Sequence, residues 1–355
     1  MELELRQLGV CIVGATGAVG LEFLRVLEQR DFPIGRLRLF ASAKSVGKRI
    51  AWKGTEVAVE ALAPGVFRGS ELGLFSPGSA ASKEWAPIAA REDCLVVDNS
   101  SAFRSDPAVP LVVPEVNAHA IARHKGIIAN PNCSTIQMVV ALKPLHDAAR
   151  VRRVIVTTFQ SVSGAGARAI EELREESRAV LDGRTYERKF FPHPIAFDAI
   201  PQIPQKDAFT PNGYTSEEMK MVHETRKIME DERIQVCPTC VRVPVFRAHS
   251  ESVLAELERP LTAAQARELL ARAPGVVLVD DPARQAYPLA VDAAGKDPVY
   301  VGRVRDDISN QQAGPASPGG IAFWCVSDNL RKGAALNAVQ IAERAFGLPA
   351  GREVR

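Results

Sequence analysis

The sequence predicts an α/β protein with a parallel sheet in its first part and a mixed α+β domain inserted after it. Apolar strand-like runs alternate with helical ones up to residue 131, which is typical of a parallel sheet. Beyond residue 150 this alternation gives way to a long β-branched run and a proline-rich segment. The chain has 355 residues, more than one typical hydrophobic core holds, so two domains are expected.

Composition and charge favour a globular protein whose partners are small molecules or copies of itself. Charged residues make up 24% and hydrophobic residues 46% of the chain, and the net charge is +2. This balance argues against a nucleic-acid or membrane-surface partner, and no apolar run reaches the ~20 residues that span a bilayer. Residues 1–6 carry charge where a secretory signal needs an apolar core. We therefore expect a soluble, cytoplasmic protein.

The first strand runs into a glycine-rich turn. Val10–Val13 precede the turn Gly14–Gly20, and apolar residues then recur at helical spacing. Glycines let the backbone approach a pyrophosphate, whose charge lies on N–H groups at the helix start. The spacing is GxxGxxG rather than the commoner GxGxxG, and a tight turn without a ligand is the alternative. In its strand–turn–helix context the motif predicts a Rossmann-type dinucleotide-binding domain.

The end of the second strand, at residues 37–41, indicates which dinucleotide binds. An NAD-specific site places an acidic residue there for the ribose hydroxyls. This chain continues instead with Ser42, Lys44 and Ser45, which suit a 2′-phosphate. The pattern therefore predicts NADP, although Lys44 and Lys48 as ordinary solvated charges are the alternative.

Four more strands are expected at residues 72–75, 94–98, 111–115 and 126–129. Ligands of parallel sheets bind at the carboxyl ends of the strands. Arg104 follows such an end and could bind an oxyanion, the alternative being a surface arginine.

The stretch Asn130–Thr135 joins the last of these strands to a helical run and contains Cys133. Pro131 disfavours helix for the residue before it, and the short polar residues that follow are good helix starters. Cys133 is therefore expected at a helix N-terminus, where N–H groups and the helix dipole favour the thiolate. The alternative is an inert buried cysteine.

The second domain begins with a strand at residues 154–159 and a helix at 167–181. The proline-rich segment after it, near residues 190–212, is longer than an ordinary loop. We therefore expect it to pack against another part of the protein, such as a second subunit. Glu217 and Lys220 share one face of a helix that starts after Thr215, and a surface ion pair is the simplest interpretation.

Residues 240–250 form a strand-like run that carries Arg242 and His249, and His249 is a natural base for a cysteine nucleophile. The two residues have opposite parity on a regular strand, but Pro244 suggests a bend that could bring both to one pocket. Cys237 and Cys240 have CxxC spacing without a second ligand pair, so we interpret them as structural. A further strand at 319–326 and a closing helix at 330–346 complete the chain.

Five motifs together resemble the aspartate-semialdehyde dehydrogenase family: Gly14–Gly20, Asn130–Thr135, Phe159–Gly164, Glu217–Lys220 and Arg242–His249. The related reductases of N-acetylglutamyl phosphate share the fold and chemistry but differ around the cysteine. The resemblance implies reversible, NADP-dependent reduction of L-aspartyl 4-phosphate to L-aspartate 4-semialdehyde and phosphate, through a cysteine thioacyl intermediate. That reaction lies on the route to lysine, threonine and methionine.

The resemblance also implies roles for individual residues. Cys133 would be the nucleophile, His249 the acid/base, and Gln160 the group that orients the acyl carbon. Arg242 and Glu217 would bind the substrate carboxylate and amino group. The phosphate would lie against Arg104, Asn132 and Lys220. NADP would be lined by Gly14, Thr16, Gly17, Ala18, Val19, Ser42, Lys44, Ser45, Ser163, Gly164 and Asn329.

The expected layout is an NADP-binding domain of residues 1–131 and 328–355, with a catalytic and dimerisation domain, 132–327, inserted in it. A homodimer or a tetramer is expected. The competing class is a non-catalytic NADP-binding protein, which would be expected to lack Cys133, Gln160 or His249, whereas all three are present.

Overall fold

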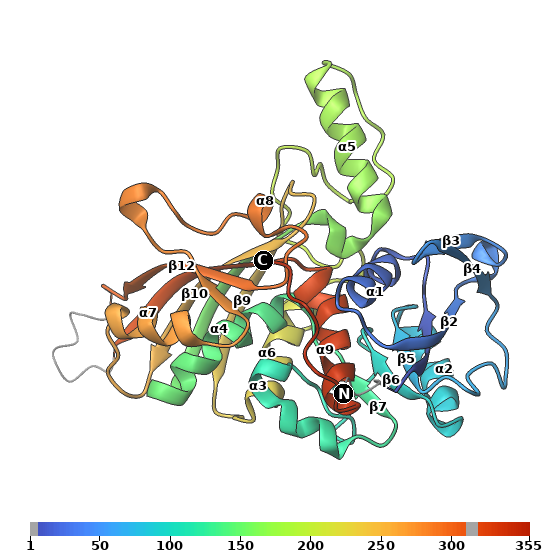
Figure 1. Ribbon diagram of the computed structural model, residues 1–355. Coiled ribbons are helices and arrows are strands. Elements are labelled where there is room, and N and C mark those ends of the chain that lie inside the picture. The colour runs from blue at the N-terminus through green and yellow to red at the C-terminus, as the bar shows by residue number, and fades with distance from the viewer. Residues whose placement is uncertain (1–5, 310–318) are drawn as a thin grey trace. The chain divides into compact units, whose positions relative to one another are not determined.

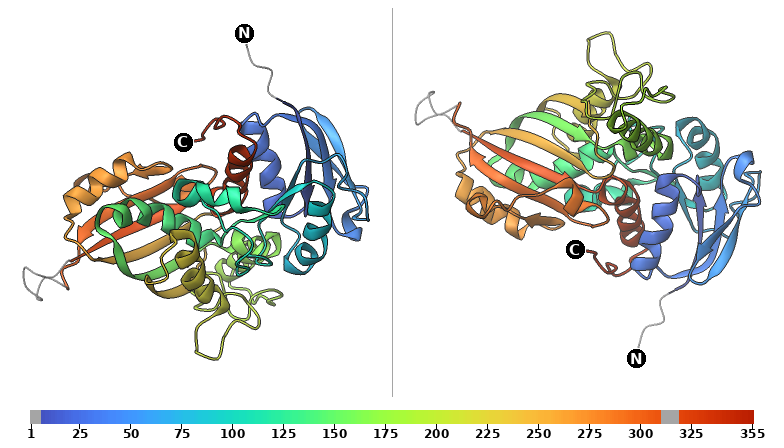
Figure 2. Two further views of the ribbon diagram at one scale, coloured as in Figure 1. Left: turned by 90° about the horizontal axis from the view of Figure 1, so that it is seen from below. Right: turned by 90° about the horizontal axis from the view of Figure 1, so that it is seen from above.

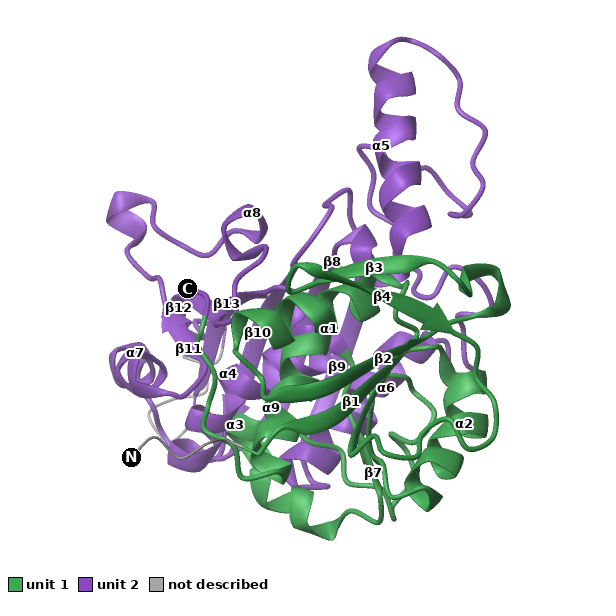
Figure 3. Ribbon diagram, turned by 45° about the vertical axis from the view of Figure 1, so that its right-hand side comes forward, with its two compact units in different colours: residues 1–132, 334–353 green, residues 133–333, 354–355 purple. Residues whose placement is uncertain are grey.

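The computed structural model describes residues 6–309 and 319–355, and the chain divides into two compact units (Figures 1 and 3). The first comprises residues 1–132 and 334–353, and the second comprises 133–333 and 354–355. The return to the first unit comes at 334 rather than at the predicted 328. Asp328 accepts hydrogen bonds from Arg247 and Gly295, which bind this stretch into the second unit. Residues 1–5, part of the charged stretch weighed against a secretory signal, lie outside the described residues.

The first unit is built on a seven-stranded sheet in the order β3-β4-β2-β1-β5-β6-β7. Neighbouring strands are parallel except β3 and β4, which confirms the predicted fold class. The strands are β1 (Leu8–Val13), β2 (Ile34–Phe40), β3 (Arg49–Trp52), β4 (Thr55–Glu60), β5 (Leu72–Phe75), β6 (Leu95–Asp98) and β7 (Ile127–Ala129). The helices are α1 (Ala18–Gln29), α2 (Ser79–Arg91), α3 (Pro114–Asn117) and α9 (Leu336–Ala345).

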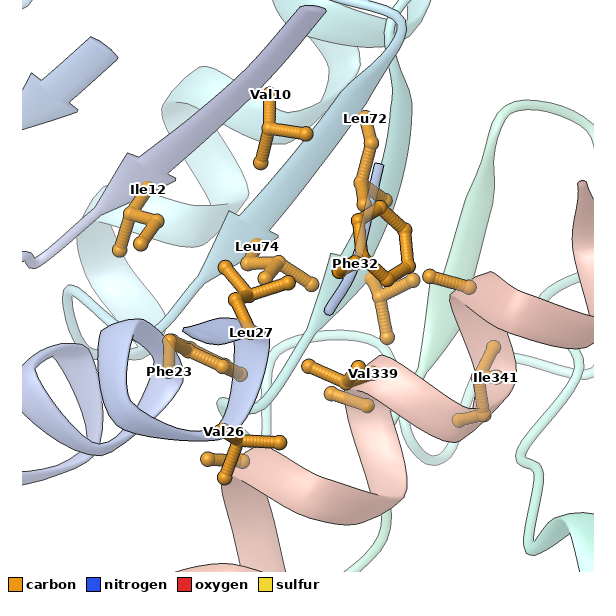
Figure 4. Close-up of a cluster of buried hydrophobic side chains, with 14 of the residues drawn as sticks. Val10, Ile12, Phe23, Val26, Leu27, Phe32, Leu72, Leu74, Val339 and Ile341 are labelled. Atoms are coloured by element: carbon orange, nitrogen blue, oxygen red, sulfur yellow. The ribbon is translucent and has the colours of Figure 1, made fainter. Parts of the chain in front are cut away.

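The hydrophobic core of the first unit contains side chains from both the first and the last part of the chain. Figure 4 shows Val10 and Leu74 of the sheet facing Leu27 of α1 and Val339 of α9. Burial of such side chains contributes about 1.5–3 kcal/mol each. The last helix therefore completes the first sheet's core, as the interrupted layout requires.

The glycine turn after β1 is closely packed. Gly14 has φ +87°, and a Cβ there would lie 2.5 Å from the carbonyl oxygen of Ser76. A Cβ on Gly20 would lie 2.2 Å from the carbonyl oxygen of Gly14. Helix α1 then begins at Ala18 without a side-chain cap. The glycines are thus required by the turn itself, and the helix start carries no capping side chain.

The prediction of a strand at residues 111–115 is wrong. Leu111 makes an isolated bridge to Ala129, and Pro114 opens the short helix α3. Proline lacks an N–H but suits the first position of a helix, so the apolar run changes direction there instead of extending.

The second unit contains a six-stranded mixed sheet in the order β11-β12-β13-β10-β8-β9. Helices α4, α6 and α7 pack against one face of it (Figure 2). The strands are β8 (Val151–Gln160), β9 (Gln235–Arg242), β10 (His249–Leu257), β11 (Val276–Leu278), β12 (Val299–Asp306) and β13 (Gly320–Ser327). The helices are α4 (Cys133–Ala149), α5 (Ala167–Leu181), α6 (Ser216–Met229), α7 (Ala263–Arg272) and α8 (Ala290–Ala293).

The proline-rich segment packs on α5, with which it projects from the sheet (Figure 1). Two buried glutamates of α5 bind its backbone. Glu172 accepts hydrogen bonds from three consecutive N–H groups, those of Lys189, Phe190 and Phe191, and Glu176 accepts two more, from Ile195 and Ala196.

The run from Arg242 to His249 is not one strand. Strand β9 ends at Arg242 and β10 begins at His249, so residues 243–248 form a connection. Pro244 lies in that connection, and Ala248 adopts φ +72° directly before His249. The parity argument for a single strand therefore does not apply, because the two side chains belong to different strands. The predicted helix at 330–346 likewise begins as a π-helix, Arg331–Ala335, before α9.

Candidate active site

Helix α4 begins at Cys133, as the sequence predicts. The cysteine is unoxidised and partly buried. Gly333 of the π-helix limits the position of Cys133, because a Cβ built on Gly333 would lie only 2.8 Å from the Cβ of Cys133. Real Cβ atoms do not approach so closely, so glycine is needed for Cys133 to keep its position. Sequence reasoning missed Gly333, since the two residues are distant along the chain.

We expect Gly333→Ala to lower kcat by about 10–100-fold, because displacement of a reacting group by roughly 1 Å has effects of that size. The thermal midpoint should change much less than it would on loss of a core side chain. Steady-state kinetics and thermal unfolding of the same preparation check this. Wild-type kcat in Gly333→Ala would contradict the close packing of the two residues.

Gln160 ends β8 and pairs in register with Arg242 of β9. Its Nε2 donates to Ser134 Oγ at 2.6 Å and to Glu217 Oε1 at 3.2 Å. Its Oε1 is buried and has no hydrogen-bond partner among the described residues. Buried polar atoms are nearly always paired, so this oxygen is an acceptor available to a ligand.

Glu217 comes from the first turn of α6, which a capping box between Thr215 and Glu218 fixes. Its carboxylate is 3.0 Å from Lys220 Nζ, the predicted i, i+3 pair. The pair is not an ordinary solvated one, because the Glu217 side chain is 9% exposed and the Lys220 side chain 32%. Glu217 therefore presents a buried carboxylate beside Gln160.

Arg242 is buried, and its Nη1 donates to the carbonyl oxygen of Ser161 at 2.6 Å. Its Nε has no hydrogen-bond partner among the described residues. Burial lowers the pKa of Arg242, although the nearby charges of Glu217 and Cys133 act in the opposite direction. The guanidinium thus lies close enough to both residues to interact with their charges.

His249 is fully buried, and its Nδ1 lies 3.0 Å from the backbone nitrogen of Ser161. Burial, and then the charge of Arg242, lower the pKa of His249 to about 3. A Cβ built on Gly164 would lie 3.2 Å from Arg242 Nη1 and 3.3 Å from His249 Nε2. The side chains of Arg242 and His249 therefore both lie close to Gly164, which has no side chain of its own.

The first unit holds other predicted cofactor and phosphate residues beyond the carboxyl ends of its strands. The short 3₁₀ helix Ala43–Ser45 follows β2, and Thr16 Oγ1 donates to Ser45 Oγ at 3.3 Å. Ser42 and Lys44 are exposed there. Arg104 donates to the carbonyl oxygens of Asn130 and Asn99, both at 2.9 Å, just beyond β7 and β6. Asn132 is buried at the end of the unit.

Comparison with known proteins decides the family. Residues 9–124 match the family described as "Semialdehyde dehydrogenase, NAD binding domain", and residues 142–332 match "Semialdehyde dehydrogenase, dimerisation domain". The chain is 53% identical to the aspartate-semialdehyde dehydrogenase of Aquifex aeolicus and 54% identical to that of Legionella pneumophila. These alignments cover 94% and 95% of this chain and 96% and 95% of the relatives. The chain belongs to the aspartate-semialdehyde dehydrogenase family.

Solved structures of family members agree with this assignment. A crystal structure of aspartate semialdehyde dehydrogenase II from Vibrio cholerae, described as complexed with ASA, is 50% identical with a TM-score of 0.91. It covers 96% of this chain and 98% of its own. Members of the aspartate-semialdehyde dehydrogenase family are oxidoreductases, and the protein is therefore an enzyme of that class.

In the second unit, the side-chain amide of Asn329 is suited to bind part of a dinucleotide. Asn329 Oδ1 accepts hydrogen bonds from Ser161 Oγ, Ser163 Oγ and the N–H of Ala248, at 3.0–3.1 Å. Its Nδ2 is buried and has no partner among the described residues. The amide is therefore held firmly by its oxygen, while its N–H₂ group remains available to an acceptor such as a carboxamide.

Cys237 and Cys240 both lie in β9, three residues apart, so their side chains point to opposite faces of the strand. They cannot hold one metal ion together. No cluster of three or more His, Cys, Asp or Glu side chains suited to a metal was found in the described ranges. Within those same ranges, no helix has the length and apolar character needed to cross a bilayer.

Sequence reasoning also missed Glu251, which is fully buried two residues beyond His249 on β10. It therefore points to the same face of the sheet. Its register partners are Thr158 of β8 and Cys325 of β13. Burial raises the pKa of Glu251 well above its ordinary value, against a smaller opposing effect of Gln137. Burial therefore favours the neutral form of this carboxyl group.

Proposed function

We propose that the protein catalyses the reversible, NADP-dependent reduction of L-aspartyl 4-phosphate to L-aspartate 4-semialdehyde and phosphate through a thioacyl intermediate on Cys133. This reaction belongs to the biosynthesis of lysine, threonine and methionine. The relatives are named for the same aldehyde, and residues suited to each part of the substrate are present.

The main support for this proposal comes from two buried charged side chains in the second unit. Aspartate semialdehyde has an α-carboxylate, an α-ammonium group and a reactive carbonyl. Arg242 supplies a buried cation suited to the carboxylate, and Glu217 supplies a buried anion suited to the ammonium. Because isolated buried charges are costly, both residues gain from a ligand with complementary charges.

Cys133 would form the covalent bond to the acyl carbon. A thiolate at a helix start attacks the acyl phosphate, phosphate leaves with the electron pair of the broken C–O bond, and a thioester remains on sulfur. Bound NADPH supplies the hydride that reduces the thioester to the aldehyde. Gln160 would orient the acyl group, and His249 would act on its carbonyl oxygen. Arg104, Asn132 and Lys220 are proposed to bind the phosphate.

NADP rather than NAD is proposed from the end of β2. Ser42 and Lys44 are exposed there, and no acidic residue occupies residues 41–48. The ribose 2′-phosphate would gain a cation and hydroxyl groups at this place. The glycine turn before α1 would hold the pyrophosphate, and Asn329 would contribute its amide N–H₂ group.

A homodimer is proposed from the second unit. The face of its sheet opposite α4 carries large side chains that stay half-exposed, including Ile155, Phe159, Leu254 and Trp324. Such an apolar sheet face is suited to a second copy of the chain, in agreement with the matched dimerisation domain.

The test is a phosphate titration of aldehyde oxidation. Purified protein should reduce NADP with L-aspartate 4-semialdehyde only when phosphate or a phosphate analogue is present, because phosphate must cleave the thioester. NADP should give a higher kcat/KM than NAD. N-Acetylglutamate semialdehyde should be a poor substrate. Steady turnover without phosphate would disprove the acyl-phosphate reaction, and absence of any turnover would favour a non-catalytic dinucleotide-binding protein.

A further inference from the structure

The ends of β6 and β7 are joined by side chains as well as by backbone. Asp98 and Ala129 are the register partners that end the two strands, and the N–H of Asn130 donates to the carbonyl oxygen of Asp98 at 2.8 Å. Beyond this bond, Nδ2 of Asn130 donates to Asn99 Oδ1 at 2.6 Å. The residues that follow the two strands are therefore held directly to each other.

Arg104 is held by the same two residues. Its Nε donates to the carbonyl oxygen of Asn130 and its Nη2 to that of Asn99, both at 2.9 Å. Nε–H and one N–H of Nη2 lie on the same edge of the planar guanidinium, so the two bonds fix both its position and its plane. A change in the separation of Asn99 and Asn130 would therefore turn the guanidinium.

A third amide, on α9, fixes the orientation of the Asn130 side chain. Asn337 and Asn130 are both fully buried. Nδ2 of Asn337 donates to the carbonyl oxygen of Val112 at 2.9 Å and to Asn130 Oδ1 at 2.7 Å. Nδ2 of Asn130 donates in turn to the carbonyl oxygen of Ala334 at 3.2 Å and to Asn99. A carbonyl oxygen only accepts, so neither amide can be turned over, and each amide nitrogen uses both of its hydrogens.

We propose that Asn337 and Asn130 are positioning residues for Arg104, and that this directional chain of amides from α9 to the end of β6 sets the affinity of the enzyme for phosphate. The inference rests on the proposed function, in which Arg104 binds the phosphate group. Asn337 acts on phosphate only through Asn130 and Arg104 in this scheme, and it lies outside the five sequence motifs.

The chemistry of the ligand makes the effect selective. A phosphate group binds best to a guanidinium that presents two parallel N–H groups, and this match is lost when the plane of the guanidinium turns. The aldehyde group carries no charge, and the charged α-groups of the substrate are assigned to Arg242 and Glu217 in the second unit. Displacement of Arg104 should therefore weaken the use of phosphate more than that of the aldehyde or NADP.

Aldehyde oxidation at varied phosphate concentration is the first test. Asn337→Leu keeps the approximate size of the side chain and removes both N–H donors. It should raise KM for phosphate by about 10-fold, with KM for the aldehyde and for NADP within about 2-fold of wild type. Gln340→Leu is the matched control, because Gln340 lies on the same helix and donates to Glu115 instead. It should keep the wild-type KM for phosphate. Similar increases in all three KM values in Asn337→Leu would indicate a general structural defect and overturn the proposal.

A double-mutant cycle shows whether Asn337 acts through Arg104. Arg104→Leu should raise KM for phosphate more than Asn337→Leu does, and the two changes together should give no further increase. Additive effects would contradict the proposal. If thermal unfolding shows that Asn337→Leu does not fold, Asn337→Asp replaces it in the cycle. A buried neutral acid offers one hydrogen to two acceptors, so this variant should raise KM for phosphate by a smaller factor.

Direct binding of inorganic phosphate separates this inference from the proposed function. Titration of each protein with phosphate, followed by ³¹P NMR, needs no turnover. Binding should be weaker in Asn337→Leu and in Arg104→Leu than in wild type, and unchanged in Gln340→Leu. If wild-type protein oxidises no aldehyde while these binding differences are found, the proposed function fails and the positioning role stands. Equal phosphate affinity in wild type and Asn337→Leu would overturn the positioning role.

Discussion

Cys133→Ser is expected to lower kcat by at least ~10³-fold while binding of NADP is retained. The serine hydroxyl is nearly the same size as the thiol, so the contact with Gly333 and the start of α4 should persist. Serine does not ionise at neutral pH and forms an ester instead of a thioester, so neither attack on the acyl phosphate nor hydride transfer proceeds at a useful rate.

The covalent intermediate gives a direct measurement of this prediction. Wild-type protein mixed with aldehyde and NADP in the absence of phosphate should accumulate an acyl adduct, visible by intact-protein mass spectrometry, whereas Cys133→Ser should show none. Cys237→Ser is the matched control, because Cys237 is also partly buried but lies in β9. It should form the adduct at the wild-type rate. An adduct on Cys133→Ser would place the nucleophile elsewhere.

Glu251→Gln is expected to stabilise the protein, with a gain that grows as pH rises. Burial raises the pKa of Glu251 in the folded state above the ordinary 4.5, so above pH 4.5 the unfolded chain loses a proton that the folded chain keeps. Stability from this residue is therefore present below pH 4.5 and is lost as pH rises, by up to about 1.4 kcal/mol per pH unit, until the folded pKa is reached. Glutamine has the shape of the neutral acid and does not ionise.

Thermal midpoints measured at several pH values check this. The midpoint of Glu251→Gln should equal that of wild type near pH ~5 and exceed it by several degrees at pH ~8. Glu256→Gln is the matched control, because Glu256 lies on the same strand but forms ion pairs with Arg152 and Arg153. It should show no gain that grows with pH. A Glu251→Gln protein that is less stable than wild type at pH ~8 would mean that the carboxylate is ionised and paired in the native state.

The parts that sequence could predict are those in which the signal is local. The glycines at 14 and 20, the alternation of strands and helices, and a helix start at Cys133 each depend on neighbouring residues, and the structure has these elements. The strand predicted at 111–115 failed because Pro114, read as part of an apolar run, opens a helix. The strand-like run expected from residue 242 to residue 249 joins two separate strands in the structure. The sequence did not show this, because β-propensity does not indicate where one strand ends and the next begins.

The parts that sequence could not predict depend on partners far apart in the chain. Ser161 lies 88 residues from His249 and 168 residues from Asn329 along the chain. No local sequence pattern predicts the hydrogen bonds among them. The same is true of Gly333, whose need to be glycine arises only from its packing against Cys133. The residues that perform chemistry could be proposed from their type and order, whereas those that fix their geometry became visible only in three dimensions.

The π-helix Arg331–Ala335 has a consequence for how this region tolerates change. A π-turn holds one residue more than an α-turn, and such insertions are frequent at functional sites. Deleting a single residue here would let the backbone relax to a regular α-helix, but each residue removed rotates what precedes it by about 100° around the axis. Gly333 would then turn away from the thiol and a side chain would take its place. This turn must therefore keep its length as well as its glycine.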